Sequence, residues 1–369
     1  MAETPVVSTV STVPATFNIY ELNTDITENV TKHLNPLDLL ELSFVSKDWL
    51  QLITSFRVHI KTLYIGLKGL TQDPASGVAS IILGIQLVRR GFSHFFFYQR
   101  SQEQIDTELA ADEKVLIRKF NGIDFKVKID SSSVKVYTTD PLDAFYNVLE
   151  HCLCIFPGPP HHFSLGHVEQ KLDHIVLQVL QQHKVGACET LAIPAGCIIS
   201  EKLLKHLMGM ETLKGLYQNS ACVRNFRHAK PINIRYFTLP YAEWMTRRSL
   251  LMLNCETVDL GDPKVSLKDL NALIMHWMKG ENKRLRRISM NFCKGWAWET
   301  DKKGGRDLFV DLDPQTWIEG KSPRDRFYED KSKKLDCEKG KDITRADGAL
   351  ATILCDSSNF HFLVWSYPA

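Results

Sequence analysis

Hydrophobic residues near the start of the chain recur at helical spacing. In one stretch every fourth residue is apolar, which places these side chains on one face of a helix. The four residues are Leu22, Ile26, Val30 and Leu34. Asn35 and Pro36 end this helix, because a residue before proline disfavours the αR conformation. Pro36 also suits the first turn of a second helix, and Ser46 is the expected N-cap of a third. We therefore predict three short helices within residues 17–56.

Beyond Ile53 the pattern changes to alternating strands and helices. The apolar run 78–90 is interpreted as a buried helix that Gly91 ends. Asp140 and Pro141 are expected to start another helix, with Asp as the cap and Pro at the first position. The remaining segments predict strands, with turns near Asn121-Gly122 and 131–133. The predicted strands are 58–65, 95–98 and three runs within 116–136.

Further along the chain the alternation becomes more regular. Strands follow one another at roughly 20 to 30 residues, a spacing typical of leucine-rich-repeat units, although no Leu/Asn consensus repeats. We predict an irregular stacked β-α arrangement, and a compact α/β domain with a partly parallel sheet is the alternative. The predicted helices are 167–183, 201–210, 241–250 and 266–278, and the predicted strands are 191–193, 213–217, 232–237, 257–260 and 285–290.

The two ends of the chain differ from this middle part. Residues 1–15, rich in Ser, Thr, Val and Pro, are expected to be a disordered leader. The highly charged residues 324–341 are expected to form an exposed loop. Residues 342–354 predict a hairpin with Asp347-Gly348 as its type I′ turn, and 360–365 predict a final strand. The predicted fold class is thus α+β or α/β: an N-terminal three-helix unit, then an irregular leucine-rich-repeat-like β-α domain with a C-terminal β-hairpin.

Composition and charge exclude several classes of protein. The 369 residues are 44% apolar and carry a formal net charge of +2. This suits about two globular domains and gives no overall signal for nucleic acid or an anionic membrane. No secretory signal is visible, and the longest apolar run, 78–88, is too short to span a bilayer. Nine cysteines without C-x-x-C spacing indicate a reducing compartment. We therefore expect a soluble protein of the cytoplasm, the nucleus or both.

The sequence predicts no enzymatic chemistry. It lacks the patterns G-x-x-x-x-G-K-S/T, G-x-G-x-x-G and G-x-S-x-G. His161, His162 and His167 follow a Pro-rich loop without a Cys or carboxylate at ligand spacing, so a metal site is not predicted. Cys152 and Cys154 alternate as in a buried strand. We expect no cofactor, no metal and no catalytic residue.

A basic run at 283–287 is the best candidate for binding an acidic partner. As a strand it would present two arginines on one face and Leu285 with Arg287 on the other. Such arginines suit an acidic or phosphorylated ligand, and the alternative, which we favour, is a solvated face. Two tryptophans in a Gly-rich stretch are candidates for exposed anchors, whereas Trp277 is expected in the core. The candidate substrate-binding residues are Arg284, Arg286, Trp296 and Trp298.

The N-terminal helical segment, residues 22–53, resembles an F-box. The matching order is Asp25-Ile26, Val30, Leu34-Asn35-Pro36-Leu37-Asp38-Leu39-Leu40 and Val45-Ser46-Lys47-Asp48-Trp49. F-boxes carry an amphipathic first helix, an L-x-P-x-D-L-L start to the second and V-S-K-x-W at the third. Most begin with Leu-Pro, where this chain has Leu22-Asn23. The resemblance implies docking on a Skp-type adaptor, and through it on a cullin, by burial of apolar side chains. The residues implied at or beside that contact are Leu22, Ile26, Leu34, Pro36, Leu37, Leu39, Leu40, Val45 and Trp49.

The C-terminal two thirds of the chain resemble the type 2 F-box-associated domain, which is common in the expanded nematode F-box families. The resemblance covers about 188–365, and the segments 270–285, 342–353 and 362–365 carry it. The implied organisation is an F-box at 17–56 and an α/β substrate-recognition region at 57–369.

Together the resemblances imply the substrate-recognition subunit of a Skp–cullin–F-box ubiquitin ligase. Its role would be non-catalytic: it would hold an unidentified protein substrate near the conjugating enzyme, with no nucleic-acid or membrane partner. The Leu22-Asn23 pair motivates a second hypothesis, a protein-interaction module without ligase activity. A third, an enzyme with an unfamiliar site, would require a deep pocket with convergent titratable groups.

Overall fold

The structure is a computed structural model, and it describes most of the chain beyond residue 23. The described residues are 24–31, 33–56, 58–67, 79–88, 91–107, 112, 114–168, 172–195, 197, 199–219, 226–292, 306–330, 334–356 and 358–365. The predicted leader, Leu22, Trp296 and Trp298 lie outside the described residues.

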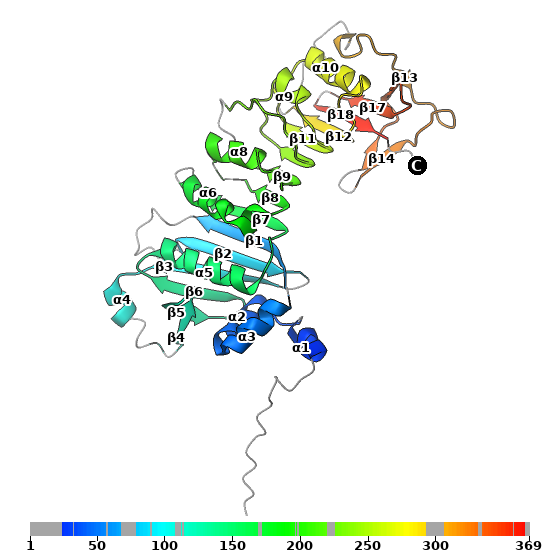
Figure 1. Cartoon of the computed structure of the whole chain (residues 1–369). Helices are drawn as coiled ribbons and strands as arrows, with labels where there is room; N and C mark the ends of the chain where they lie inside the picture. The colour runs from blue at the N-terminus through cyan, green and yellow to red at the C-terminus, as the bar shows by residue number, and fades with distance from the viewer. Residues whose placement is uncertain are drawn as a thin grey trace, which may run out of the picture.

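Helices and strands alternate through most of the described chain (Figure 1). The helices are α1 (Thr24–Thr31), α2 (Pro36–Val45), α3 (Lys47–Ser55), α4 (Gln102–Thr107), α5 (Pro141–Ile155), α6 (Asp173–Gln181), α7 (His183–Gly186), α8 (Glu201–Met208), α9 (Arg247–Leu251), α10 (Leu267–Met278) and the 3-10 helix η4 (Arg306–Leu308). The strands are β1 (Ile60–Leu67), β2 (Ile81–Leu87), β3 (Phe92–Gln99), β4 (Val115–Phe120), β5 (Ile123–Ile129), β6 (Ser133–Thr138), β7 (His162–Val168), β8 (Thr190–Ile193), β9 (Gly215–Gln218), β10 (Tyr236–Leu239), β11 (Thr257–Gly261), β12 (Arg287–Asn291), β13 (Gln315–Thr316), β14 (Phe327–Glu329), β15 (Lys334–Asp336), β16 (Lys341–Thr344), β17 (Leu350–Cys355) and β18 (Asn359–Val364).

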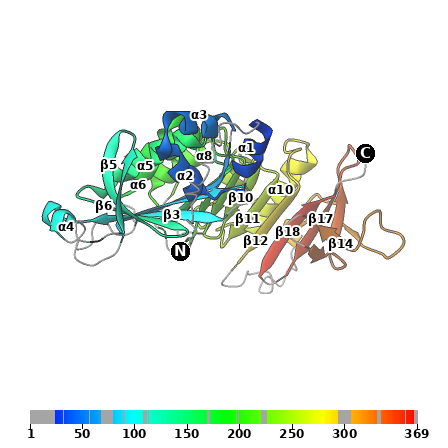
Figure 2. The same ribbon diagram turned by 90° about the horizontal axis from the view of Figure 1, so that it is seen from below.

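One large sheet dominates the molecule. Its sixteen strands follow the order β13-β16-β17-β18-β12-β11-β10-β9-β8-β7-β1-β2-β3-β6-β5-β4. In its middle part β1 and β7 to β12 run parallel, whereas β16, β17 and β18 pair antiparallel at one end and β4, β5 and β6 at the other. Helices α5, α6, α8 and α10 cover one face, and the other face is largely open (Figures 1 and 2). The fold therefore has mixed helix and strand content, as predicted.

The spacing of the parallel strands agrees with the predicted repeat length. From β7 to β12 the strands start at residues 162, 190, 215, 236, 257 and 287, so successive starts are 21 to 30 residues apart. The middle part is thus a stack of β-α units that is also a partly parallel sheet. The likeness to leucine-rich repeats stays a prediction, since the sheet continues at both ends into antiparallel strands.

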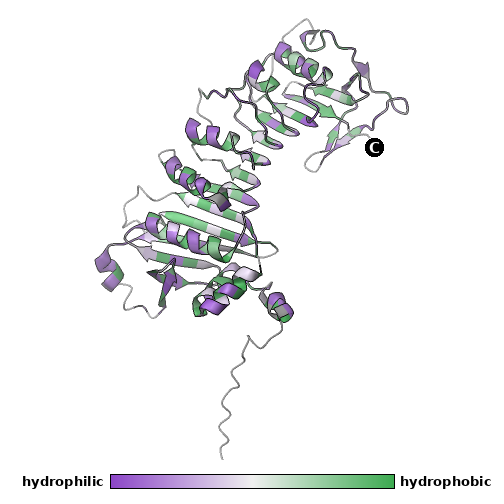
Figure 3. Ribbon diagram, in the orientation of Figure 1, coloured by the Kyte–Doolittle hydropathy of each residue, from purple (hydrophilic) through white to green (hydrophobic). Residues whose placement is uncertain are grey.

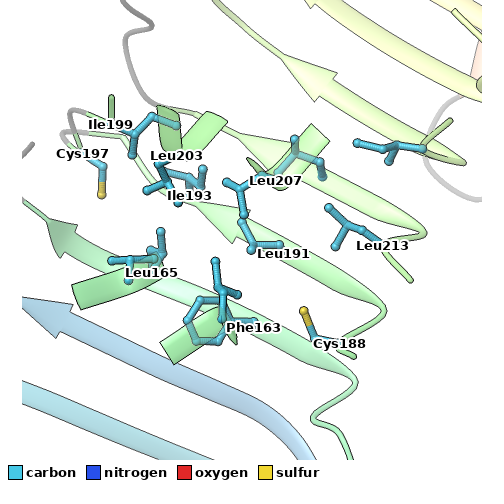
Figure 4. Close-up of a cluster of buried hydrophobic side chains, with 14 of the residues drawn as sticks. Phe163, Leu165, Cys188, Leu191, Ile193, Cys197, Ile199, Leu203, Leu207 and Leu213 are labelled. Carbon is cyan, nitrogen blue, oxygen red and sulfur yellow. The ribbon is translucent and has the colours of Figure 1, made fainter. Parts of the chain in front are cut away.

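The core of each β-α unit lies between its helix and the sheet. Leu191 and Ile193 of β8 point toward Leu203 and Leu207 of α8, and all four side chains are buried. Figure 4 shows this cluster continuing to Phe163 of the neighbouring strand β7. Figure 3 shows hydrophilic residues on the same helices, so each is amphipathic.

The predicted helix at 78–90 is wrong, because the described part of this segment forms strand β2. Ile81, Leu83, Ile85 and Leu87 alternate into the core and are at most 1% exposed. A short apolar run fits a buried strand or a buried helix equally well by pattern, and β-branched residues favour the strand. The flanking strands β1 and β3 decide between them, and both pair with β2 along its length.

Three other local predictions fail near α5. Cys152 and Cys154 lie in this helix rather than in a strand, with Cys152 buried and Cys154 exposed. His162 and His167 belong to strand β7 instead of a loop, so the helix predicted from residue 167 begins only at Asp173. The predicted start of α5 is confirmed, since Asp140 Oδ1 accepts hydrogen bonds from the backbone N–H groups of the next turn.

The predicted exposed loop at 324–341 is also wrong. Strands β14 and β15 form a hairpin there, and Arg324 is buried. The hairpin of β16 and β17 is confirmed, but its turn is not type I′, because Gly348 has a positive φ (+86°) and Asp347 does not. A longer loop with glycine in the left-handed region joins these strands. The turn at Asn121-Gly122 does have two positive φ values, 47° and 86°, as the I′ geometry requires.

Candidate docking surface and substrate surface

Local hydrogen bonds set the boundaries of the N-terminal helices. Asn35 Oδ1 accepts from the backbone N–H groups of Leu37 (2.8 Å) and Asp38 (3.0 Å). Asp38 Oδ2 accepts in return from the Asn35 N–H (3.2 Å), which completes a capping box at the start of α2. The Ser46 hydroxyl accepts from the Trp49 N–H (3.1 Å) and caps α3. The predicted starts of both helices are therefore confirmed.

Most of the residues predicted to contact an adaptor are buried within this chain. Leu37, Leu39, Leu40 and Trp49 are at most 6% exposed and belong to the same core as the sheet. Pro36 is buried and Leu34 is half-buried. Ile26 and Val45 are exposed by 50% and 66%, and Val30 of α1 is exposed by 43%. Among the described residues of these helices, Ile26, Val30 and Val45 offer a partner much of their side-chain surface. Adaptor contact stays a prediction for the whole predicted set.

An aromatic cluster around Phe44 joins α2 to the sheet region. The Phe44 ring stacks on His151 of α5 (centroids 5.1 Å apart) and meets Phe120 of β4 edge-on (5.2 Å). Beside it, the Arg118 guanidinium forms a fork with the Glu41 carboxylate, whose shortest N–O distance is 2.6 Å. Burial lowers the pKa of His151 to about 4, so the ring in this cluster is neutral at pH 7.

The open face of the sheet forms a second candidate surface between β9 and β12. Strand register places Tyr217, Thr238, Asp259 and Ser289 side by side in one row. The residues that alternate with them, such as Val258 and Leu260, face the core. This row is therefore a floor of polar and aromatic side chains that no helix of the described chain covers.

The β14–β15 hairpin closes one side of this floor and creates a groove. Tyr328 packs edge-on against Trp365 (centroids 5.3 Å apart) and buries Leu363 beneath it. Burial raises the pKa of Tyr328 to about 12. The groove has a volume of about 730 Å³, and Arg286 is one of its lining residues. The other lining residues are Tyr217, Arg235, Tyr236, Phe237, Thr238, Glu256, Thr257, Asp259, Arg287, Tyr328, Glu329, Asp330 and Trp365.

The structure separates the members of the predicted basic run. Arg284 and Arg286 are exposed, and Arg286 lines the groove whereas Arg284 donates to the Asn254 carbonyl (3.4 Å). Arg287 is 1% exposed, so the favoured reading of a solvated face is wrong for this residue. Its guanidinium binds Asp259 (2.8 and 3.0 Å) and lies 2.6 Å from Asp330. These carboxylates come from distant parts of the chain, so no local pattern could have identified the contact.

Other chemistry finds little support in the described residues. None of their His, Cys, Asp and Glu side chains gather in a group of three that could hold a metal ion, and none of the helices there is long and apolar enough to cross a membrane. Burial raises the pKa of the Cys188 and Cys255 thiols to about 12, which keeps both protonated and weakly nucleophilic at pH 7. Trp277 is 1% exposed, which confirms its predicted place in the core.

Two family models match the chain at these surfaces. The model described as "F-box domain" matches residues 19–61, which include α1, α2 and α3. The model described as "F-box associated" matches residues 225–290, which include β10, α9, β11 and α10. The chain carries an F-box and a type 2 F-box-associated domain. Proteins with these domains are generally non-catalytic adaptors, and the floor of the groove lies largely within the F-box-associated match.

Two uncharacterized proteins of Caenorhabditis elegans are similar to this F-box protein. F59B2.9 is 22% identical over 95% of this chain and 79% of its own length. F59B2.8 is 30% identical over 37% of this chain and 31% of its own length. No solved structure matches the chain.

Proposed function

We propose that the chain is the substrate-recognition subunit of a Skp–cullin–F-box ubiquitin ligase in the cytoplasm, the nucleus or both. The observation that carries this proposal is the order of an F-box followed by an F-box-associated domain in one chain. The F-box binds a Skp-type adaptor, which holds the cullin, and the groove on the open face holds a protein substrate. Proximity of the bound substrate to the conjugating enzyme accelerates transfer, and the thioester chemistry belongs to other subunits.

Exposed apolar residues of the F-box support adaptor docking. Ile26, Val30 and Val45 together present apolar surface on α1 and at the end of α2. Burial of such surface stabilises a complex by about 25 cal/mol per Å², before the entropic cost of association. The predicted contact set therefore acts mainly through Ile26 and Val45, with Val30 as an added exposed residue beside them and the buried members holding the helices in place.

The character of the groove supports substrate binding rather than catalysis. Tyr217 and Tyr236 supply aromatic surface of the kind that dominates binding interfaces. Arg286 has no ion-pair partner among the described residues, so it can receive an acidic or phosphorylated group of the substrate. Two carboxylates of the groove are held by arginines, Asp259 by Arg287 and Glu256 by Arg235, which suits recognition better than proton transfer.

Calorimetry with a purified Skp-type adaptor tests the proposal on the full chain. The wild type is expected to bind, and Val45→Asp is expected to weaken the complex at least about tenfold, because it buries a charge in an apolar contact. Ile318→Asp, at a residue exposed by 52% in the C-terminal part, is the control and leaves affinity unchanged. Absence of wild-type binding overturns the proposal.

A protein-interaction module without ligase activity is the second candidate. The burial of Pro36, Leu37, Leu39 and Leu40 favours it, because the chain's own core already occupies side chains predicted to meet the adaptor. Adaptor binding that fails to recruit a cullin supports this candidate over the first.

A further inference from the structure

We propose that the adaptor-docking surface extends beyond the F-box onto the β4–β5 hairpin, with Leu116 and Ile123 as contact residues. The inference rests on the proposed function, because the partner is the same Skp-type adaptor. β4 is the last strand at one end of the sheet, so one of its edges has no neighbouring strand among the described residues. Figure 1 shows this end of the sheet beside helices α2 and α3.

Contacts with α2 identify the face of the hairpin that adjoins the F-box. Phe120 meets Phe44, and Arg118 binds Glu41, so both β4 side chains lie on the α2 side. Side chains two residues apart on a strand share a face. Leu116 therefore lies on the α2 side as well.

The partner strand adds a second apolar residue to this face. Ile123 is directly opposite Phe120 in the antiparallel register, and opposed residues point to the same side. Leu116 is 37% exposed and Ile123 is 44% exposed, so they flank the buried contact with α2 and remain open to a partner. Ile117 is 64% exposed but lies on the opposite face of the strand.

The hairpin surface adjoins the end of α2. Val45 follows Phe44 directly, and the Phe44 ring contacts the hairpin. At the turn, Asn121 Nδ2 donates to Glu150 of α5 at 2.7 Å and anchors the hairpin to the same helix that supports α2. Surfaces held in this way lose little conformational freedom on binding, which favours docking of a rigid partner.

The edge of β4 is poorly suited to pairing with a second copy of the chain. Arg118 Nη1 donates to the Ile117 carbonyl at 3.0 Å and covers one acceptor of the strand. Lys119 and Asp124 form a charged pair across the hairpin, and charges on an edge strand oppose edge-to-edge pairing. The side-chain face with Leu116 and Ile123, rather than the backbone edge, is thus the surface offered to the adaptor.

Matched variants of the full chain test the extension by calorimetry against the adaptor. Leu116→Asp and Ile123→Asp are expected to weaken binding about tenfold, as each buries a charge at the contact. Ile117→Asp is the control, because it places the same charge on the neighbouring residue and the opposite face. Thermal unfolding of all three variants checks that each still folds. If Leu116→Asp does not fold, Leu116→Ser is the milder substitution at the same position.

Each outcome separates this inference from the proposed function. If Val45→Asp weakens binding and the Leu116 and Ile123 variants do not, docking ends at the F-box and the extension is wrong while the ligase proposal stands. Equal weakening by Ile117→Asp also overturns the extension, because the effect then does not depend on which face of β4 carries the charge. If the wild type does not bind the adaptor, the proposed function itself fails. If the wild type forms a dimer that Leu116→Asp abolishes without changing the affinity for the adaptor, that result assigns the surface to a second copy of the chain and overturns the inference.

Discussion

At the scale of single residues, Arg324 shows how completely this chain encloses one ion pair. Its side chain is 1% exposed, and its Nε donates to Asp342 Oδ1 at 2.7 Å. The rings of Trp317 and Trp365 lie 5.9 and 5.3 Å from the guanidinium carbon. Because both charges are buried, loss of one partner leaves the other without compensation.

Arg324→Ala is therefore expected to lower the free energy of unfolding by about 3–5 kcal/mol. Arg326→Ala is the matched control, because Arg326 pairs with Asp336 but is 43% exposed, and its loss should cost much less stability than that of Arg324. Urea unfolding followed by tryptophan fluorescence measures both values. Similar losses in the two variants would contradict the assignment of Arg324 to a buried pair.

At the scale of elements, a single histidine links α2 to α5. His151 stacks on Phe44 and lies 3.3 Å from the Ser43 hydroxyl. Burial lowers its pKa in the folded chain to about 4, below the unfolded value near 6.5. The neutral ring thus contributes stability that is fully present above pH 6.5 and is lost as the pH falls toward 4.

We expect His151→Phe to reduce this acid sensitivity, because phenylalanine keeps the stacking and cannot be protonated. Between pH 7 and pH 4 the wild type should lose about 2–3 kcal/mol more stability than the variant. Chemical denaturation at pH 7 and pH 4 gives the free energy of unfolding of the wild type and of the variant. The other titrating groups are common to both proteins, so their contributions cancel in the comparison. The same pH dependence in both would show that His151 does not titrate in this range.

At the scale of the whole molecule, the F-box and the sheet region share one hydrophobic core. Leu39 and Ile53 are fully buried, and they belong to the same cluster as residues of β2, β3 and α5. The boundary predicted at residue 57 therefore cuts through a common interior, and the F-box match itself extends to residue 61.

Removal of residues 1–56 should destabilise the remainder, because it uncovers apolar surface on α5 and the sheet. Size-exclusion chromatography and thermal unfolding are expected to show aggregation or a lower melting temperature for fragment 57–369. Leu39→Ala in the full chain is the companion variant and should cost about 2–5 kcal/mol. A fragment that melts like the full chain would mean that the F-box is an independent unit.

Contacts between near neighbours were predictable from the sequence. The caps at Ser46 and Asp140 and the turn at Asn121-Gly122 join residues a few positions apart, so residue type and spacing suffice to identify them. The F-box pattern rests on the same kind of local information.

The sequence by itself thus determined the starts of α2, α3 and α5, the tight turn at Asn121-Gly122 and the two domains that the family models match. The tertiary structure alone decided that 81–87 is a strand, that Arg287 is buried and that most predicted adaptor residues face the chain's own core. The physical reason is that burial and strand pairing depend on partners far apart in the chain. β2 becomes a strand between β1 and β3, Arg287 is enclosed by Asp259 and Asp330, and Leu39 is covered by the sheet region.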